Sequence, residues 1–179
     1  RYIDHMASHE EEYEEKKREP FQVSLTREES KEGHILKWFK IERDSDEPIP
    51  GFYVQSKPSP SGDTLLFAHG LEDRKEDVMN LSEVADRFDL NMLAIDARRH
   101  GERKSDFLGH PALDLLRDLG RTIVDNRLVI DAALQKGWAQ SGKVLFIGSS
   151  MGAILGGVMS AVETRISGAV LYVPGGDLV

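Results

Sequence analysis

Cysteine, positive charge and aromatic residues are scarce in this 179-residue sequence, and the first two scarcities exclude several kinds of protein. With no cysteine at all, the chain has no disulfide, no thiolate ligand for a metal and no cysteine nucleophile. Lysine and arginine together number 23 against 31 aspartates and glutamates, which gives a formal net charge of -8. Phosphate binding needs a basic face, so we expect no nucleic-acid partner, and the same charge disfavours an anionic membrane surface.

The overall composition is that of a globular protein. Apolar residues make up 40% of the chain and charged residues 30%, and the length suits one domain with a substantial core. The first twenty residues are too polar to contain the apolar region of a secretory signal peptide, and the sequence begins with Arg1 rather than methionine. The lack of cysteine fits a cytoplasmic protein, which is the location we expect. No spacing among the six histidines predicts a metal site, and we expect no cofactor.

The N-terminal part predicts a helix followed by antiparallel strands. Residues 1–19 are rich in charge at helical i,i+4 spacing, and we interpret them as a solvated helix outside the domain formed by residues 20–179. Residues 21–28 and 34–42 alternate apolar and polar side chains, as half-buried strands do. The prolines and glycine of the following DSDEPIPG segment predict a turn before a third short strand, residues 51–57.

From Asp63 onward, continuous apolar runs alternate with helical patterns. Such runs are typical of strands that are buried on both faces of a parallel sheet. One helical pattern lies between residues 78 and 88, and another lies between residues 116 and 134, where Gly137 is placed to cap the helix. The alternation predicts an α/β fold, with a mostly parallel sheet flanked by helices. Its parallel strands are expected at about residues 64–69, 91–96, 143–148 and 168–173.

The segment from residue 144 to residue 162 has no charged side chain and allows two interpretations. Its length is marginally sufficient for a membrane span, and its glycines have the spacing of packed membrane helices. However, Gly148 interrupts it at strand length, and a lone span would break the regular strand–helix alternation. We therefore predict a strand, a sharp turn and a helix, with the pentad Gly148-Ser149-Ser150-Met151-Gly152 at the turn. This pentad matches G-x-S-x-G, in which a serine stands exposed on a strained strand-to-helix turn.

Two further segments carry a family resemblance together with this pentad. His69-Gly70 directly follows one apolar run, and a segment from Asp96 to His100-Gly101 follows the next. These three motifs, in this order, resemble the α/β-hydrolase superfamily over about residues 20–179, and most of all its carboxylesterases and acyl-peptidase-type hydrolases. The second segment departs from the D-x-R-G-H-G-x-S pattern of that family, because Arg99 stands in place of the glycine and Arg103 in place of the serine.

The resemblance implies a carboxylesterase-like serine hydrolase that acts on a small-molecule ester. In that reading Ser150 is the nucleophile, and the backbone N–H groups of Leu71 and Met151 form the oxyanion hole. Asp177 is a weak candidate for the triad acid. The resemblance also assigns loop-supporting roles to His69, Gly70, Gly148, Gly152, Asp96, Arg98 and His100. The remaining histidines, at positions 5, 9, 34 and 110, are expected on the surface.

The triad histidine is missing from this interpretation. In the superfamily it follows the serine and the acid, yet no histidine follows Ser150 in this sequence. The run at residues 169–173 is apolar on both faces, which predicts a neighbouring strand on each side. We therefore expect the chain to be the N-terminal portion of a longer hydrolase, without its C-terminal strands, or to have its sheet completed by a partner chain or a homo-oligomer.

Two other functions stay open at this point. The first is that of a binding or regulatory protein with the same fold, in which Ser150 has no catalytic role. The other is a nucleotide-binding α/β protein, although the sequence has neither G-x-G-x-x-G nor G-x-x-x-x-G-K-[ST].

Overall fold

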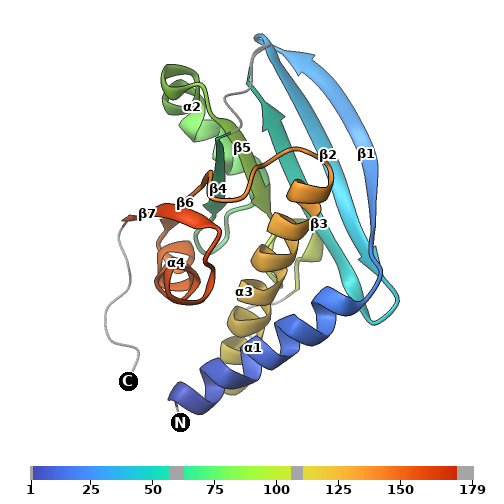
Figure 1. The fold of residues 1–179 in the computed structure, drawn as a ribbon, viewed down its shortest axis with the longest axis vertical. Coiled ribbons are helices and arrows are strands. Elements are labelled where there is room, and N and C mark those ends of the chain that lie inside the picture. Colours follow the sequence, from blue (N-terminus) through green and yellow to red (C-terminus); the bar gives the residue numbers. More distant parts are fainter. Residues whose placement is uncertain (1, 57–62, 106–110, 173–179) are drawn as a thin grey trace.

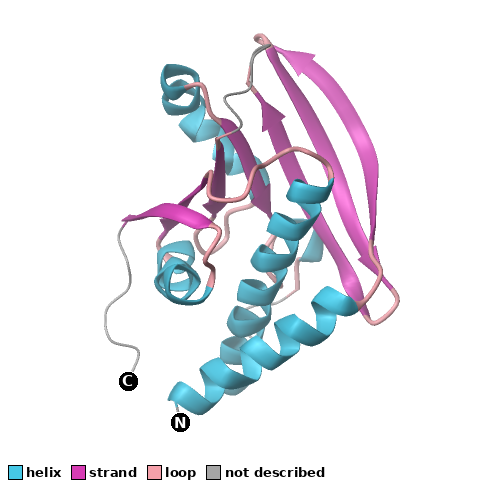
Figure 2. Ribbon diagram, viewed as in Figure 1, coloured by secondary structure: helices cyan, strands magenta, loops and turns pink. Residues whose placement is uncertain are grey.

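The computed structural model describes residues 2–56, 63–105 and 111–172, which form a single mixed sheet with helices on both faces (Figures 1 and 2). The seven strands of the described residues lie in the order β1-β2-β3-β5-β4-β6-β7. The elements are α1 (Tyr2–Arg18), β1 (Gln22–Lys31), β2 (His34–Arg43), β3 (Asp46–Gln55), β4 (Thr64–Ala68), η1 (Lys75–Leu81), α2 (Ser82–Phe88), β5 (Asn91–Ile95), η2 (Gly101–Arg103), α3 (Ala112–Gln135), β6 (Val144–Ser149), α4 (Met151–Val162) and β7 (Ile166–Tyr172).

The antiparallel half of the sheet consists of β1, β2 and β3, and β3 also pairs antiparallel with β5. The turn predicted at DSDEPIPG is shorter than expected: it occupies Asp44 and Ser45, while β3 already begins at Asp46 and contains both prolines. Only residues 51–54 of β3 pair with β5, so Pro48 and Pro50 lie in a part of the strand that has a full ladder on one side only. Proline is tolerated there because its missing N–H breaks no second ladder.

The parallel half of the sheet consists of β5, β4, β6 and β7, and its strands lie close to the four predicted ranges. Both β4 and β5 are buried along their whole length, as the continuous apolar runs indicate. Because neighbouring strands here are parallel, their carboxyl ends meet at one edge of the sheet. The motifs that follow β4, β5 and β6 are therefore brought to that edge together.

Helices α1, α3 and α4 cover one face of the sheet, and η1 and α2 cover the other. Side chains of the first group share a core with Phe39, Leu66 and Phe146, while Val78 of η1 and Ala85 of α2 pack in a second core. Figure 1 shows α1 lying across α3. Helix α3 ends at Gln135, and Gly137 has a φ of +68°, so this glycine caps the helix as the sequence predicts.

The helical pattern at residues 78–88 resolves into two short elements rather than one helix. A 3₁₀ segment, η1, precedes α2, and each is only seven residues long. Val84 and Phe88 belong to the expected apolar stripe, but their side chains are exposed. Val78 and Ala85 are buried against the sheet and Leu81 is partly buried beside them, so the expected stripe packs only in part.

Strand β7 forms an edge of the sheet in the described part of the chain, where it pairs with β6. Val170, Leu171 and Tyr172 are exposed, at 60%, 36% and 68% of their surface. An apolar strand with an open edge invites pairing with another strand. The expected neighbour on the outer side of β7 thus stays a prediction. Among the described helices, none is long and apolar enough to cross a membrane.

Candidate active site

Ser150 lies at the turn between β6 and α4, in a backbone conformation that few residues adopt. Strand β6 ends at Ser149 and α4 begins at Met151, which leaves Ser150 between them with φ +50° and ψ -112°. Residues other than glycine rarely adopt a positive φ. Holding a serine in this conformation costs of order 1–3 kcal/mol. The side chain is exposed at the carboxyl edge of the sheet. This is the geometry that the G-x-S-x-G pentad predicts.

Two glycines make this turn possible by letting backbone segments come close. A Cβ atom on Gly148 would lie 2.3 Å from the carbonyl oxygen of Gly152, and one on Gly152 would lie 2.0 Å from the carbonyl oxygen of Ala68. Any larger residue would therefore push α4 away from β6, or β4 away from α4. Tight packing of three elements around the turn holds Ser150 in its strained conformation.

Hydrogen bonds hold the Ser150 backbone on both sides. Its N–H donates to the carbonyl oxygen of Tyr172 in β7 at 2.9 Å, and its own carbonyl oxygen accepts from the N–H of Ala153 at 2.9 Å. The second bond begins helix α4. Ser150 therefore stands at a helix N-terminus, where unpaired amides and the positive end of the helix dipole favour negative charge.

The loop after β4 lies directly beside this turn. A Cβ atom on Gly70 would be 3.6 Å from the Cβ of Ser150, so His69-Gly70 and the serine turn are neighbours in space. The next residue, Leu71, is 42% exposed. Within the described part of the chain, neither the Leu71 N–H nor the Met151 N–H donates to an acceptor. The predicted oxyanion donors, Leu71 and Met151, thus belong to the two segments that meet at Ser150.

His69 is buried, and both of its ring nitrogens are engaged. Its Nδ1–H donates to the carbonyl oxygen of Gly70 at 2.8 Å, and its Nε2 accepts from the N–H of Ala97 at 3.0 Å. Burial lowers the pKa of His69 and so favours the neutral ring that this pattern requires. Its ring lies 5.2 Å from that of His100, whose Nδ1–H donates to the carbonyl oxygen of Arg98. A histidine engaged in this way holds two loops together and has no nitrogen free for proton transfer.

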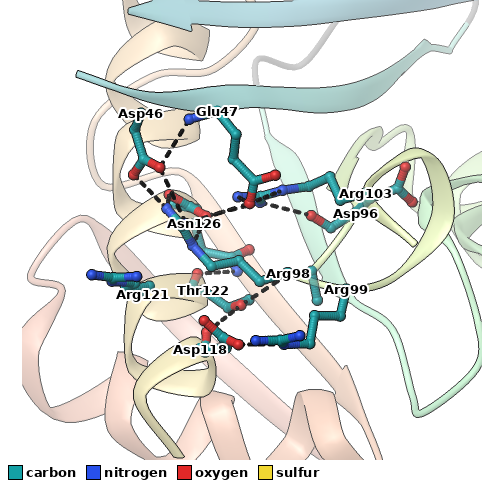
Figure 3. A network of polar contacts seen from close by, with 12 residues as sticks. Asp46, Glu47, Asp96, Arg98, Arg99, Arg103, Asp118, Arg121, Thr122 and Asn126 are labelled. Atoms are coloured by element: carbon teal, nitrogen blue, oxygen red, sulfur yellow. Dashed lines mark hydrogen bonds and ion pairs between the residues drawn. The ribbon is translucent and has the colours of Figure 1, made fainter. Parts of the chain in front are cut away.

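The loop after β5 is fixed by ionic contacts, most of which are buried (Figure 3). Asp125 of α3 accepts from both Arg98 and Arg103, and Arg103 also donates to the carbonyl oxygen of Asp96. Arg99, which stands where the family pattern has glycine, takes the left-handed conformation with φ +66°. Its guanidinium pairs with Asp118, which compensates for a conformation that glycine adopts more easily.

Sequence reasoning missed Lys75, Asp46, Glu47 and Asp125. Lys75 has 2% of its surface exposed, and its ammonium contacts the fully buried carboxylate of Asp96 at 2.8 Å. Asp46 and Glu47 belong to the segment interpreted as a turn, and they bind Arg98 and Arg103. No sequence signal identifies these residues, since each pair joins positions that are at least 21 residues apart.

The expectation that the remaining histidines lie on the surface is wrong for two of them. His9 of α1 packs against Gly120 of α3, where a Cβ atom would lie 1.9 Å from the imidazole ring. His34 of β2 is also buried, and its Nε2 contacts Asp86 of α2 at 2.8 Å. The side chain of His5 lies outside the described residues, as do His110 and the candidate acid Asp177.

Across residues 2–56, 63–105 and 111–172, no three histidine, aspartate or glutamate side chains gather in a way that could hold a metal ion. A polar cavity of about 450 Å³ lies beside the loop after β4. It is lined by residues 72–77, 101, 102 and 104, and all of these except Gly101 carry charged side chains, of both signs.

Comparison with known proteins gives similar structures but no similar sequence. No family model matches the chain, and no curated protein matches it. An acetyl xylan esterase from Thermoanaerobacterium sp. JW/SL YS485 superposes with a TM-score of 0.73 at 17% identity, covering 95% of this chain and 57% of that one. An acetyl xylan esterase from Paenibacillus sp. R4 gives 0.72 at 18% identity, covering 94% and 58%.

A cold-adapted esterase from an Arctic intertidal metagenomic library gives a TM-score of 0.66 at 24% identity, covering 82% of this chain and 64% of that one. At these identities the likeness establishes the fold, which is the predicted α/β-hydrolase type. The chain spans between 57% and 64% of the length of these three esterases.

Proposed function

We propose that this chain is part of a serine hydrolase that acts on small carboxylic esters through an acyl-serine intermediate. The observation that carries the proposal is the strained conformation of Ser150 at a strand–helix turn, with φ +50°. Strain of this kind persists only where the surrounding structure enforces it, and it gathers at functional sites. The resemblance of the fold to three esterases supports the same reaction class.

The reaction would proceed in two steps. The Ser150 Oγ attacks the ester carbonyl carbon while a general base takes its proton, and the carbonyl oxygen becomes an oxyanion next to the Leu71 and Met151 amides. Collapse of this intermediate expels the alcohol, which receives the proton from the base, and leaves the acyl group on Ser150. Water then attacks the acyl-serine with the help of the same base, releasing the carboxylic acid and restoring the serine.

The proposed reaction also needs a general base to activate Ser150. The bonding of His69 to Gly70 and Ala97 leaves that ring no nitrogen for this work. We propose that the base is a histidine from a longer protein of which this chain is the N-terminal portion, or from a partner chain. Asp177 stays a weak candidate for the acid.

The test compares the 179-residue chain with the full-length protein, each with and without Ser150→Ala, on an activated aryl ester and a fluorophosphonate label. We expect Ser150-dependent turnover and labelling in the full-length protein, and a rate lower by about 10⁴–10⁶ in the 179-residue chain, because loss of a triad member has effects of that size. Equal rates for the full-length protein and its Ser150→Ala form would contradict the proposal. Substantial Ser150-dependent turnover by a monomeric 179-residue chain would mean that it contains a base of its own.

A non-catalytic scaffold is the second candidate function. The observation in its favour is that both buried histidines next to the site donate a ring N–H to a backbone carbonyl oxygen, His69 to Gly70 and His100 to Arg98. A full-length protein that lacks Ser150-dependent labelling would support it. The cytoplasmic location stays a prediction from composition.

A further inference from the structure

The loop between β4 and η1 is held at both of its ends by two adjacent residues, Asp96 and Ala97. At its start, the Nε2 of His69 accepts from the Ala97 N–H at 3.0 Å. At its end, the backbone N–H of Lys75 donates to Asp96 Oδ1 at 2.9 Å and the Lys75 ammonium donates to Asp96 Oδ2 at 2.8 Å. The residues in between, 70–74, form what we call the 70–74 loop, and it contains the Leu71 amide.

The two ends of the 70–74 loop differ from its middle in exposure. His69 and Lys75 each have 2% of their surface exposed, and Asp96 has none, whereas residues 71–74 are all exposed. Packing therefore cannot fix the middle of the loop. Its position depends on the two buried anchors, of which the histidine was predicted from sequence and the lysine was not.

The Lys75 ammonium is held by carboxylates inside the protein rather than by solvent. Its ammonium contacts three carboxylates, those of Asp96, Glu102 and Glu76, at 2.8, 2.8 and 3.2 Å. Burial by itself lowers the pKa of Lys75, but the hydrogen bonds that its ammonium donates to Asp96 and Glu102 outweigh burial, so the pKa is raised and the ammonium stays charged. Asp96 is satisfied in turn, since it also accepts the Glu102 N–H at 3.0 Å.

We propose that Lys75 is a positioning residue, which places the Leu71 amide for the oxyanion by fixing the 70–74 loop to Asp96. The proposal rests on the proposed ester hydrolysis for its functional meaning. The structural part, that Lys75 orders this loop, stands apart from the chemistry. The Lys75 ammonium contacts the carboxylates of Asp96, Glu102 and Glu76 rather than Ser150, so it acts through Leu71.

The first experiment measures hydrogen exchange in the full-length protein at the backbone amides of residues 75 and 77, which donate to Asp96 Oδ1 and to the carbonyl oxygen of Arg74 at the end of the loop. Lys75→Met is expected to speed exchange there by roughly tenfold or more, while amides of β4 and β6 stay protected, because the loop opens without global unfolding. Lys75→Met combined with Asp96→Asn removes both buried charges, keeps an acceptor for the backbone N–H at position 75, and serves if the single variant fails to fold. Lys75→Arg keeps the cation and is expected to restore protection.

The matched control is Arg127→Met. Arg127 is likewise a buried cation paired with a buried carboxylate, that of Glu163, but its partners lie on α1 and at the end of α4. Its loss is expected to leave exchange at residues 75 and 77 unchanged. Wild-type exchange at residues 75 and 77 in a folded Lys75→Met or double variant would overturn the proposal.

The second experiment measures aryl-ester hydrolysis by the full-length protein. Lys75→Met is expected to lower kcat by on the order of 10² with little change in KM, because a misplaced oxyanion donor costs transition-state stabilisation. Lys75→Arg is expected to recover most of it. If the full-length protein has no Ser150-dependent activity, the proposed function fails, and hydrogen exchange alone decides whether Lys75 orders the loop. Faster loop exchange with an unchanged kcat would overturn the functional part.

Discussion

Two ionic clusters in this molecule use the same kinds of residue for different tasks. The site cluster lies beside the candidate active site and joins the start of β3, the loop after β5 and helix α3; its members are Asp46, Glu47, Asp96, Arg98, Arg103 and Asp125 (Figure 3). The helix cluster joins α1, α3 and the α4–β7 connection; its members are Tyr13, Arg127, Asp131, Glu163 and Arg165.

Helix α3 carries members of both clusters on different faces. Asp125 belongs to the site cluster and Arg127 to the helix cluster. The two residues are two positions apart, which is about 200° around an α-helix, so their side chains lie on nearly opposite faces. The site cluster orders an irregular loop in which Arg99 and Gly101 have positive φ. The helix cluster instead attaches a regular element, α1, whose Tyr13 ring lies under the Arg127 guanidinium at 3.6 Å.

The difference shows what buried ion pairs contribute in each place. A helix satisfies its own backbone, so the helix cluster only has to attach a finished element to the rest of the fold. The loop after β5 satisfies few of its own backbone groups, and side chains such as Arg103 and Asp96 bond to them directly. We therefore expect damage to the site cluster to spread into the fold, and damage to the helix cluster to stay local.

Acid is expected to have the largest effect, because it weakens both clusters together. Burial opposes ionisation of both Asp46 and Glu163. Hydrogen bonds from Arg98 and Lys16 outweigh burial at Asp46 and lower its pKa. Hydrogen bonds from Arg165 do the same at Glu163. A hydrogen bond from His9 lowers the pKa of nearby Glu12 to about 2.

A carboxyl with a lowered pKa binds protons more readily when the chain is unfolded, so its stabilisation is lost as the pH falls. The free energy of unfolding should therefore decline from about pH 5 towards pH 2 in urea titrations. A constant value across that range would contradict this account of both clusters.

Asp125→Leu is expected to be the most damaging single substitution in the comparison. It removes the fully buried carboxylate that pairs with both Arg98 and Arg103, and breaking a buried pair typically costs about 3–5 kcal/mol. The measurement is the free energy of unfolding in urea. Asp114→Ala on the same helix removes an exposed carboxylate and should change stability by less than about 0.5 kcal/mol. A loss below about 1 kcal/mol for Asp125→Leu would mean that the site cluster is dispensable.

Tyr13→Phe should have a smaller effect that is confined to α1. The hydroxyl donates to Asp131 and accepts from Arg165, at 3.1 and 3.0 Å, and its loss is expected to cost about 1 kcal/mol. Amide exchange should quicken in α1 and stay unchanged in the loop after β5. Tyr53→Phe, which alters another buried tyrosine outside both clusters, is the control and should leave α1 as it is. Faster exchange in both regions would show that the two clusters are one unit.

The smallest expected effect belongs to the exposed pair of Asp114 and Arg117 on α3. Their charged atoms are 3.4 Å apart, but both side chains are largely solvated. A double-mutant cycle with Asp114→Ala and Arg117→Ala should give a coupling of no more than about 0.5 kcal/mol. A coupling as large as the loss of stability expected for Asp125→Leu would mean that buried and surface ion pairs on this helix do not differ in strength.

The features that could be predicted from sequence are those set by neighbouring residues. The turn at Ser150 follows from a strand pattern, two glycines and a helix pattern within one short segment, and the parallel strands follow from their apolar runs. The buried positions of His9 and His34 depend instead on Gly120 and on helix α2, which lie far away in sequence.

Lys75 shows why part of the candidate site could not be predicted. It stands in a run of charged residues, EDRKED, in which nothing distinguishes one lysine or arginine from the next. Its burial arises from Asp96, 21 residues later, and only after β4 and β5 pair in parallel. The proline-containing β3 was missed for a related reason, since proline is excluded only from strands that are paired on both sides.

The adjacency of Asp96 and Ala97 makes the 70–74 loop sensitive to the pairing of two strands. Strands β4 and β5 pair with Phe67 opposite Ala94, and this register sets which face of the sheet each later side chain meets. A slip by one residue would reverse those faces, turning the Asp96 carboxylate away from Lys75 and offering His69 a different amide. A chain that mispairs these strands would therefore not form the proposed oxyanion site at all, rather than form a distorted one. Activity in this protein would then report whether β4 and β5 paired in the correct register during folding.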